Sequence, residues 1–245
     1  MNSAPLVCDE NRSLESLADV LRGEDQRYLA DGFIVTRGGR YLGLGTGEAL
    51  VRRVSELRIE AARHANPLTF LPGNIPTTEH LERLLEGAER FAVVHVDLTD
   101  FKPFNDHYGY SRGDEMIRLL SGLLTEHVDP SLDFVGHIGG DDFVVLFQSA
   151  DWETRCTRVI DAFNDRSPHL FDEEDIAEGG LHGKDRRGEP QFFPFTTVVM
   201  GAVELSPPLP QRAQSIAMLA ARAKRRAKRA NAGLHVTSRV ADVTG

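Results

Sequence analysis

The chain has 245 residues, 41% of them hydrophobic, which is enough for one full-sized core and a smaller appendage. Its 37 acidic and 28 basic residues give a net charge of −9, and this balance disfavours a nucleic-acid partner because phosphate contacts need a positive field. Two cysteines are too few for a disulfide framework, and the sequence shows neither a secretory signal nor a membrane-spanning apolar run. We therefore expect a cytoplasmic protein without membrane association.

The first 65 residues differ from the rest and are predicted to form a small unit. Apolar residues have helical spacing over residues 13–21, and residues 32–45 alternate as a hairpin with its turn at 37–40. A helix over residues 48–64 follows. This order of strand, turn, strand and helix resembles the closing part of a CBS-type ligand-sensing motif, too short for a complete adenosine-binding pair. We interpret residues 1–65 as a CBS-like remnant or docking module that ends in a linker helix.

The linker helix carries an apolar stripe formed by Leu50, Val54, Leu57 and Ala61. A stalk that pairs two copies of the chain needs such a stripe. Packing against the domain that follows would use the same residues, and both interpretations stay open at this point.

The second part of the chain alternates helices and strands. In chain order we expect a helix from residue 77, a strand ending at Asp97, two helices to about Val128, a hairpin over 134–147, a helix over 152–164, a polar mobile loop over 167–189, a strand over 193–203 and a helix over 211–230. Antiparallel strands in one sheet that helices cover predict an α+β fold.

Acidic residues follow two of the predicted strands. The apolar run from Phe91 to Leu98 places Asp97 at its carboxyl end, and the hairpin tip carries Gly139, Gly140, Asp141 and Asp142. The glycines permit positive φ angles and leave the backbone bare for an anionic ligand. Carboxylates at a core edge need a compensating cation, and oxygen ligands favour Mg²⁺. An ordinary turn and a helix cap at Asp100 are the structural alternatives for these residues.

These segments and the stretch between them, residues 105–114, resemble the GGDEF domain of diguanylate cyclases, which condense two GTP molecules into cyclic di-GMP. The resemblance covers roughly residues 66–236 and begins at 66–74, where Asn-Pro-Leu-Thr-Phe-Leu-Pro-Gly-Asn is similar to the family's D-x-L-T-G-L-x-N-R. The signature reads Gly-Gly-Asp-Asp-Phe at residues 139–143, a GGDDF variant one methylene short at its fourth position.

The resemblance implies a ferredoxin-like palm, similar to that of nucleotide polymerases and cyclases, with a central antiparallel sheet. We expect this domain over residues 66–238 and a carboxy-terminal tail over 239–245.

The resemblance also implies a role for individual residues. Asp97, Asp141 and the carbonyl group of Leu98 would bind Mg²⁺, with Mn²⁺ as the alternative ion. The implied catalytic residues are Asp141, Asp142 and Lys102.

The remaining implied residues bind the substrate. Asn105 and Asp114 would read guanine, because a carboxylate accepts from the N1 and N2 groups of the base and an amide supplies complementary bonds. Gly139 and Gly140 would lie along the triphosphate. Lys228, like Lys102, would offset phosphate charge.

The implied reaction is attack by the ribose 3′-hydroxyl of one GTP on the α-phosphorus of a second, with pyrophosphate leaving. Each domain holds one substrate, so the resemblance implies a head-to-tail homodimer that brings both nucleotides into line. The expected partners are therefore GTP, a second copy of the chain and a further signalling protein.

Some residues depart from the family pattern. Asp142 has a shorter side chain than the usual glutamate, Ala232 stands where many members carry arginine, and residues 130–133 lack the arginine of the product-inhibition motif R-x-x-D. These departures favour the alternative function, a catalytically inactive GGDEF domain that binds GTP and regulates a partner in cyclic di-GMP signalling. We interpret the basic cluster at 224–229 as a solvated helix face, with Lys228 as the exception.

Overall fold

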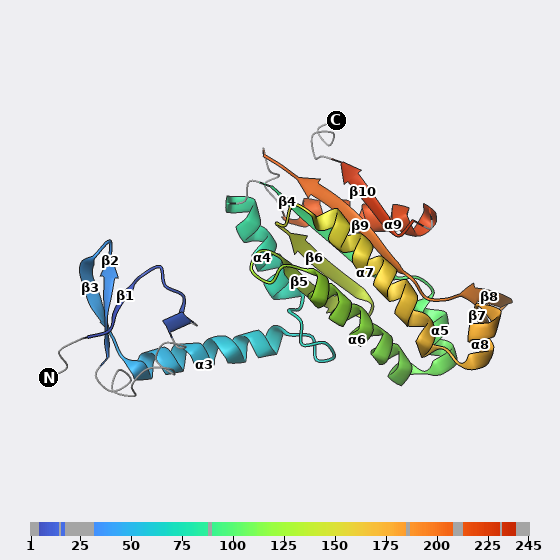
Figure 1. Ribbon diagram of the computed structural model, residues 1–245, viewed down its shortest axis with the longest axis horizontal. Coiled ribbons are helices and arrows are strands. Elements are labelled where there is room, and N and C mark those ends of the chain that lie inside the picture. The colour runs from blue at the N-terminus through green and yellow to red at the C-terminus, as the bar shows by residue number, and fades with distance from the viewer. Residues whose placement is uncertain are drawn as a thin grey trace. The chain divides into compact units, whose positions relative to one another are not determined.

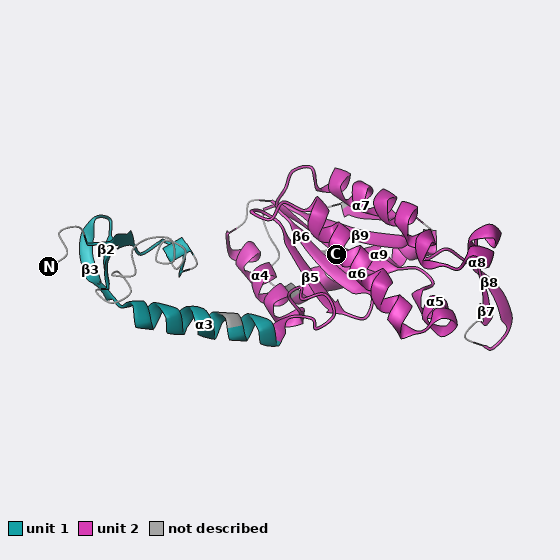
Figure 2. Ribbon diagram, turned by 60° about the horizontal axis from the view of Figure 1, so that its bottom comes forward, with its two compact units in different colours: residues 1–63 teal, residues 64–245 magenta. Residues whose placement is uncertain are grey.

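The computed structural model describes residues 5–14, 16–17, 32–87, 90–184, 187–207, 213–230 and 232–238. Most of the predicted helix over 13–21 and the whole predicted tail over 239–245 lie outside these residues. The chain divides into two compact units, residues 1–63 and 64–245, which Figure 2 colours separately. The sequence pattern predicts the boundary two residues later, between residues 65 and 66.

Unit 1 contains a three-stranded sheet and one long helix. Strand β1 (Val7–Asp9) pairs in parallel with β2 (Phe33–Arg37), which pairs antiparallel with β3 (Arg40–Gly45). Gly38 and Gly39 form the predicted turn of this hairpin with φ angles of 55° and 76°. The sheet has a small core, formed by Cys8, Leu17, Phe33 and Leu50. The resemblance to a CBS-type motif stays a prediction.

Helix α3 (Gly47–His64) carries the predicted apolar stripe, whose two halves differ in burial. Leu50 is buried in the unit 1 core, and Val54 packs against that core. Leu57 and Ala61, toward the carboxyl end, are exposed. The first half of the stripe therefore serves the fold of unit 1.

Unit 2 is built around a five-stranded sheet with the strand order β10-β9-β4-β6-β5 (Figure 1). Its elements are α4 (Asn74–Gly87), β4 (Phe91–Leu98), α5 (Phe101–Tyr108), α6 (Tyr110–His127), β5 (Phe134–Gly139), β6 (Asp142–Phe147), α7 (Trp152–Arg166), α8 (Glu173–Glu178), β7 (Gly180–Lys184), β8 (Pro190–Pro194), β9 (Val198–Leu205), α9 (Ala213–Ala230) and β10 (Leu234–Ser238). The α+β prediction is confirmed.

One detail of the predicted sheet is wrong. The other three pairings of the sheet run antiparallel as expected, but β10 pairs with β9 in parallel. This edge strand follows α9, which crosses back over the sheet, and a helical crossover returns the chain in the parallel sense. Its sequence, Leu-His-Val-Thr-Ser, is short and polar, and the sequence pattern predicts no strand at this position.

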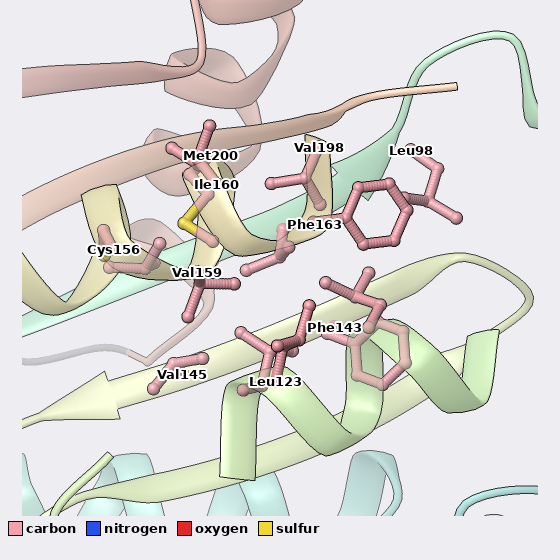
Figure 3. Close-up of a cluster of buried hydrophobic side chains, with 14 of the residues drawn as sticks. Leu98, Leu123, Phe143, Val145, Cys156, Val159, Ile160, Phe163, Val198 and Met200 are labelled. Atoms are coloured by element: carbon pink, nitrogen blue, oxygen red, sulfur yellow. The ribbon is translucent and has the colours of Figure 1, made fainter. Parts of the chain in front are cut away.

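Alternation along the central strands sorts their side chains between two cores. Even-numbered residues of β4 pack with α5, α6 and α7, whereas odd-numbered residues pack with α4 and α9. Figure 3 shows the first core, where Val159 and Phe163 of α7 meet Leu123 of α6 and Phe143 of β6. The same alternation places Asp97 on the face of the sheet that α9 covers.

The predicted mobile loop over 167–189 is wrong, because much of this segment has regular structure. A 3₁₀ helix η1 (Ser167–Leu170) and α8 lead into a hairpin of β7 and β8. Phe171 and Leu181 are buried in the core, and Ser167 Oγ donates to the Thr196 carbonyl group at 3.0 Å. These apolar anchors hold a stretch whose composition is mostly polar. The single strand predicted over 193–203 is likewise two strands, β8 and β9.

None of the described helices is both long enough and apolar enough to cross a lipid bilayer.

Phe70 occupies a backbone conformation that side chains rarely adopt. Its φ angle is 59°, and the residue is 81% exposed in the turn before α4. The left-handed region costs a residue with a bulky side chain about 1–2 kcal/mol, and the exposed ring gives little packing in return.

Phe70→Gly should therefore raise the free energy of unfolding by about 1 kcal/mol after glycine's larger unfolded-state entropy is subtracted. Thermal unfolding would then occur about 2–4 °C higher. Phe70→Ala is the matched control, because it removes the ring but keeps a Cβ atom at the strained position. Equal stability of the two variants in urea titrations would show that backbone strain is not the cause.

Candidate active site

Two predicted acids meet at the end of the central strand. β4 carries Asp97 at its carboxyl end, with only 7% of the residue exposed, and the turn between β5 and β6 carries Asp141. The two carboxyl groups are close enough to share a hydrogen bond. The structure therefore brings together the two side chains on which the metal prediction depends.

The two carboxyl groups divide their charge unequally. Burial raises the pKa of Asp141 to about 6, and the hydrogen bond to Asp97 and the charge of Asp97 add to this effect. Burial also acts to raise the pKa of Asp97, but the hydrogen bond from Asp141 and the ammonium groups of Lys224 and Lys228 lower it overall. Asp97 therefore holds the negative charge, and Asp141 holds the proton when only one is present.

A positive group already lies at the predicted metal ligands. Lys228 Nζ donates to Asp97 Oδ2 at 3.0 Å and to the Leu98 carbonyl group at 3.1 Å. An ammonium ion is thus in the place where the prediction put a divalent cation. Together with Asp141, these groups present only oxygen atoms, which suit a hard cation such as Mg²⁺. The residues present therefore fit the ion that the sequence implied.

The protein supplies only part of a coordination shell. Within the described residues, no group of three or more His, Cys, Asp or Glu side chains is arranged to hold a metal ion. Mg²⁺ commonly binds through one or two carboxylates and completes its shell with water and substrate phosphates. The donor set of Asp97, Asp141 and the Leu98 carbonyl group agrees with this kind of site.

Lys224 also contacts the acids, which the sequence interpretation of the basic cluster missed. Its Nζ atom donates to Asp142 Oδ1 and lies 3.4 Å from Asp97 Oδ2, with 16% of the side chain exposed. The prediction of a solvated face is therefore wrong at Lys224, although Arg225 and Arg226 on the same helix are exposed. The spacing of four residues from Lys228 was the available signal, because residues i and i+4 share one face of a helix.

The glycines of the signature have the backbone conformation that their turn requires. Gly139 and Gly140 have φ angles of 153° and 58°, and a Cβ atom added to either would meet no atom within 4 Å. Positive φ, rather than crowding, therefore explains the glycines. The space beside this backbone is open, as a bound triphosphate would need.

His137 stabilises the turn at Gly139 and Gly140 through a hydrogen bond. Its Nε2 atom lies 2.9 Å from the Gly140 carbonyl oxygen and its Nδ1 atom 2.9 Å from Thr69 Oγ1. A carbonyl oxygen only accepts, so Nε2 carries the hydrogen and Nδ1 accepts from the hydroxyl group. Burial lowers the pKa of His137, whose ring stacks on Phe143 with centroids 4.1 Å apart. His137 is a neutral structural residue.

The two predicted guanine readers lie at the junction of α5 and α6. The Asn105 Oδ1 atom is buried and has no hydrogen-bond partner among the described residues. It lies against Gly113, where an added Cβ atom would be 1.8 Å away, and half-buried Asp114 is the next residue. A buried acceptor without a partner is costly, and a donor from a ligand would remove that cost.

Lys102 does not reach the acids. Its Nζ atom lies 2.6 Å from Asp106 Oδ2, one turn further along α5, and its side chain is largely exposed. Among the described residues no ion pair joins Lys102 to Asp141 or Asp142, and its catalytic role stays a prediction.

Comparison with known proteins places residues 63–177 in the family described as "Diguanylate cyclase, GGDEF domain". The chain is 35% identical over 119 residues to the bifunctional diguanylate cyclase/cyclic di-GMP phosphodiesterase MucR of Pseudomonas aeruginosa, covering 46% of this chain and 17% of that protein. It is 30% identical over 126 residues to the diguanylate cyclase DgcP of the same species, covering 44% and 18%. The match therefore spans less than a fifth of either relative.

Solved structures share the fold. The coiled coil and GGDEF domain of DgcB from Caulobacter crescentus, in complex with c-di-GMP, gives a TM-score of 0.55 at 22% identity over 78% of this chain and 95% of that one. Diguanylate cyclase SiaD from P. aeruginosa, in complex with its activator SiaC, gives 0.58 at 18% identity over 92% and 75%. The chain thus carries a GGDEF domain, and its homologues include diguanylate cyclases.

Proposed function

We propose that this protein is a diguanylate cyclase, which condenses two GTP molecules into cyclic di-GMP and pyrophosphate. The observation that carries the proposal is that Asp97 and the Leu98 carbonyl group hold one ammonium group, with Asp141 within hydrogen-bond reach of Asp97, beside the open turn at Gly139 and Gly140. Oxygen ligands next to bare backbone suit a metal-bound triphosphate.

Each substrate group has a matching part of the site. Gly139 and Gly140 would lie along the triphosphate, where no side chain obstructs it. Asn105, whose buried oxygen has no partner among the described residues, would accept a hydrogen bond from guanine, and Asp114 would accept from its N1 and N2 groups. Guanine offers donors at these positions and adenine does not, so the pair would select GTP over ATP.

The protein's own charges would rearrange when the substrate binds. Asp97, Asp141 and the Leu98 carbonyl group would hold Mg²⁺, or Mn²⁺ as the alternative, and the ion would supply positive charge next to the phosphates. Lys228 has 44% of its side chain exposed, so its ammonium group is free to leave Asp97 and turn toward a phosphate. Lys102 would exchange Asp106 for a phosphate in the same way.

Two copies of the chain would be needed, because each domain holds one GTP and the reaction joins two. A head-to-tail homodimer would bring a 3′-hydroxyl group in line with the α-phosphorus of the facing nucleotide. The exposed half of the α3 stripe, with Leu57 and Ala61, offers an apolar surface to a second helix.

A second candidate function is GTP binding without turnover, in a domain that regulates a signalling partner. The observation in its favour is the ion pair between Asp142 and Lys224, which keeps the second signature acid away from a substrate. Lys224 would have to release Asp142 before that acid could take part in the reaction.

Incubation of the dimer with GTP and Mg²⁺, followed by chromatography, separates the two functions. Cyclic di-GMP that forms with the native chain but not with Asp141→Asn supports the cyclase. GTP that is bound by a confirmed dimer and recovered unchanged supports the regulator.

The base-reading role makes a separate prediction at Gly113. A Cβ atom there would displace the Asn105 side chain, so Gly113→Ala should weaken GTP binding about 5- to 100-fold, the effect of one buried hydrogen bond. ATP binding, weak already, should not change. Gly122→Ala is the control, because it lies on the same helix in open space. Calorimetry that finds equal GTP affinity in both variants would remove Asn105 from the base site.

A further inference from the structure

Five charged side chains lie close together next to the turn at Gly139 and Gly140. The carboxylates are Asp97, Asp141 and Asp142, and the ammonium groups belong to Lys224 and Lys228. The two lysines have different partners, because Lys228 contacts Asp97 and the Leu98 carbonyl group, whereas Lys224 joins Asp142 to Asp97. Lys224 thus binds Asp142, the one carboxylate of the cluster that is not among the predicted metal ligands.

Close packing between α9 and β9 fixes the backbone position of Lys224. Helix α9 lies so close to β9 that a Cβ atom added to Gly201 would be 1.9 Å from the Lys224 backbone nitrogen and 2.4 Å from its Cα atom. The Lys224 side chain therefore starts against the sheet and is 16% exposed, whereas that of Lys228 is 44% exposed. Lys228 can leave the acids for solvent or a phosphate, but the less exposed Lys224 stays between the carboxylates of Asp97 and Asp142.

The charges then match one divalent cation. Asp97, Asp141 and Asp142 carry three negative charges when all are ionised, and Lys224 offsets one of them. Once Lys228 has turned away, two negative charges are left, which one Mg²⁺ balances. A second ion would have to displace the Lys224 ammonium group from Asp142 and also from Asp97, and breaking the largely buried pair with Asp97 is unfavourable.

We propose that Lys224 is a positioning residue that holds Asp142 out of the metal site and takes the place of a second ion, so that each protomer binds one divalent cation. The inference rests on the proposed function for the identity of the site. In a head-to-tail dimer, two protomers would still bring two ions to the paired substrates, one from each side.

The test counts bound Mn²⁺ ions by electron paramagnetic resonance, in the full-length protein without nucleotide. We expect one ion per native protomer. Lys224→Met, which keeps the side-chain length but removes the charge, should free Asp142, add a second bound ion and tighten the first about tenfold or more. Lys224→Arg should restore a single ion, because the guanidinium group retains the charge.

Two further variants separate this role from a general effect of charge or folding. Lys224→Met combined with Asp142→Asn should return the count to one, because the freed ligand is gone. Arg225→Met removes the same charge from the exposed side of α9 and should leave the count and affinity unchanged. Circular dichroism checks that each variant is folded.

Unchanged Mn²⁺ binding in Lys224→Met would overturn the inference, as would two ions in the native protomer or none at all. The product assay judges the proposed function independently. Cyclic di-GMP formation with no effect of Lys224 on Mn²⁺ would retain the cyclase and reject the positioning role. If Lys224→Met alters the ion count but the native chain forms no cyclic di-GMP, the positioning role is retained and the cyclase function is rejected.

Discussion

Asp141→Asn is expected to abolish cyclic di-GMP formation and, at the same time, to make the protein more stable at neutral pH. Asp141 lies against the negatively charged Asp97 and is partly buried, which raises its pKa to about 6 from an ordinary value of 3.8. At pH 7 both groups are ionised and repel each other. An asparagine amide would instead donate a hydrogen bond to Asp97 without carrying charge.

The stability gain should depend on pH in a defined direction. Below about pH 4 Asp141 is protonated in both folded and unfolded chains, so the variant has no advantage there. As the pH rises from 4 to 7, the native protein loses stability because it must release the proton of a group whose folded pKa is raised. After allowance for solvent screening of a partly exposed group, the expected difference at pH 7 is about 1–2 kcal/mol.

Urea titrations of both chains between pH 4 and 8 measure this difference. Asp106→Asn is the matched control, because Asp106 is an exposed partner of Lys102 and its loss should change stability by no more than about 0.5 kcal/mol. Added Mg²⁺ should stabilise the native chain more than the variant, since the ion would bind the ionised Asp141. Activity should fall about 10³-fold or more through loss of a ligand to the ion. A variant less stable than the native chain at pH 7 would contradict the repulsion between the two carboxylates.

Gly201→Ala should cost about 3 kcal/mol or more of stability, the largest effect that we expect from adding one methyl group. The added atom would be 1.9 Å from the Lys224 nitrogen and 2.5 Å from the Ala223 carbonyl carbon. Both are backbone atoms, so no side chain can turn aside and α9 must move off the sheet. Overpacking of a core commonly costs about 1–3 kcal/mol, and a rigid neighbour places this site at the upper end or beyond.

Chemical denaturation measures the loss, which should lower the melting temperature by about 6–12 °C. Gly122→Ala is the opposite case, because Gly122 is exposed in the middle of α6 with no atom near its missing Cβ. That variant should gain about 0.5–1 kcal/mol through better helix propensity. Equal stability of the two variants would mean that α9 tolerates displacement and that the positions of Lys224 and Lys228 are not set by close packing.

The parts of unit 2 that the sequence predicted well are those where local pattern and tertiary role agree. Strand β4 is a nearly continuous apolar run because it is buried on both faces. The hairpin of β5 and β6 is indicated by two glycines between apolar runs. Segment 167–189 and strand β10 have polar sequences and are held by a few distant contacts, such as Phe171 in the core and β9 alongside β10. Such distant contacts produce no local periodicity in the sequence from which the secondary structure could be predicted.

The residue types alone account for much of the chemistry of the site, namely which side chains carry oxygen ligands and where the turn needs glycine. The pairing of the charges depends instead on contacts between elements far apart in the chain. Lys224 was hidden in a basic cluster, and its role follows from the bare Gly201, which lets α9 approach the sheet until the ammonium group lies between Asp97 and Asp142. The physical reason is that residue type sets what a group can bind, whereas close packing between elements distant in sequence sets which partner it meets.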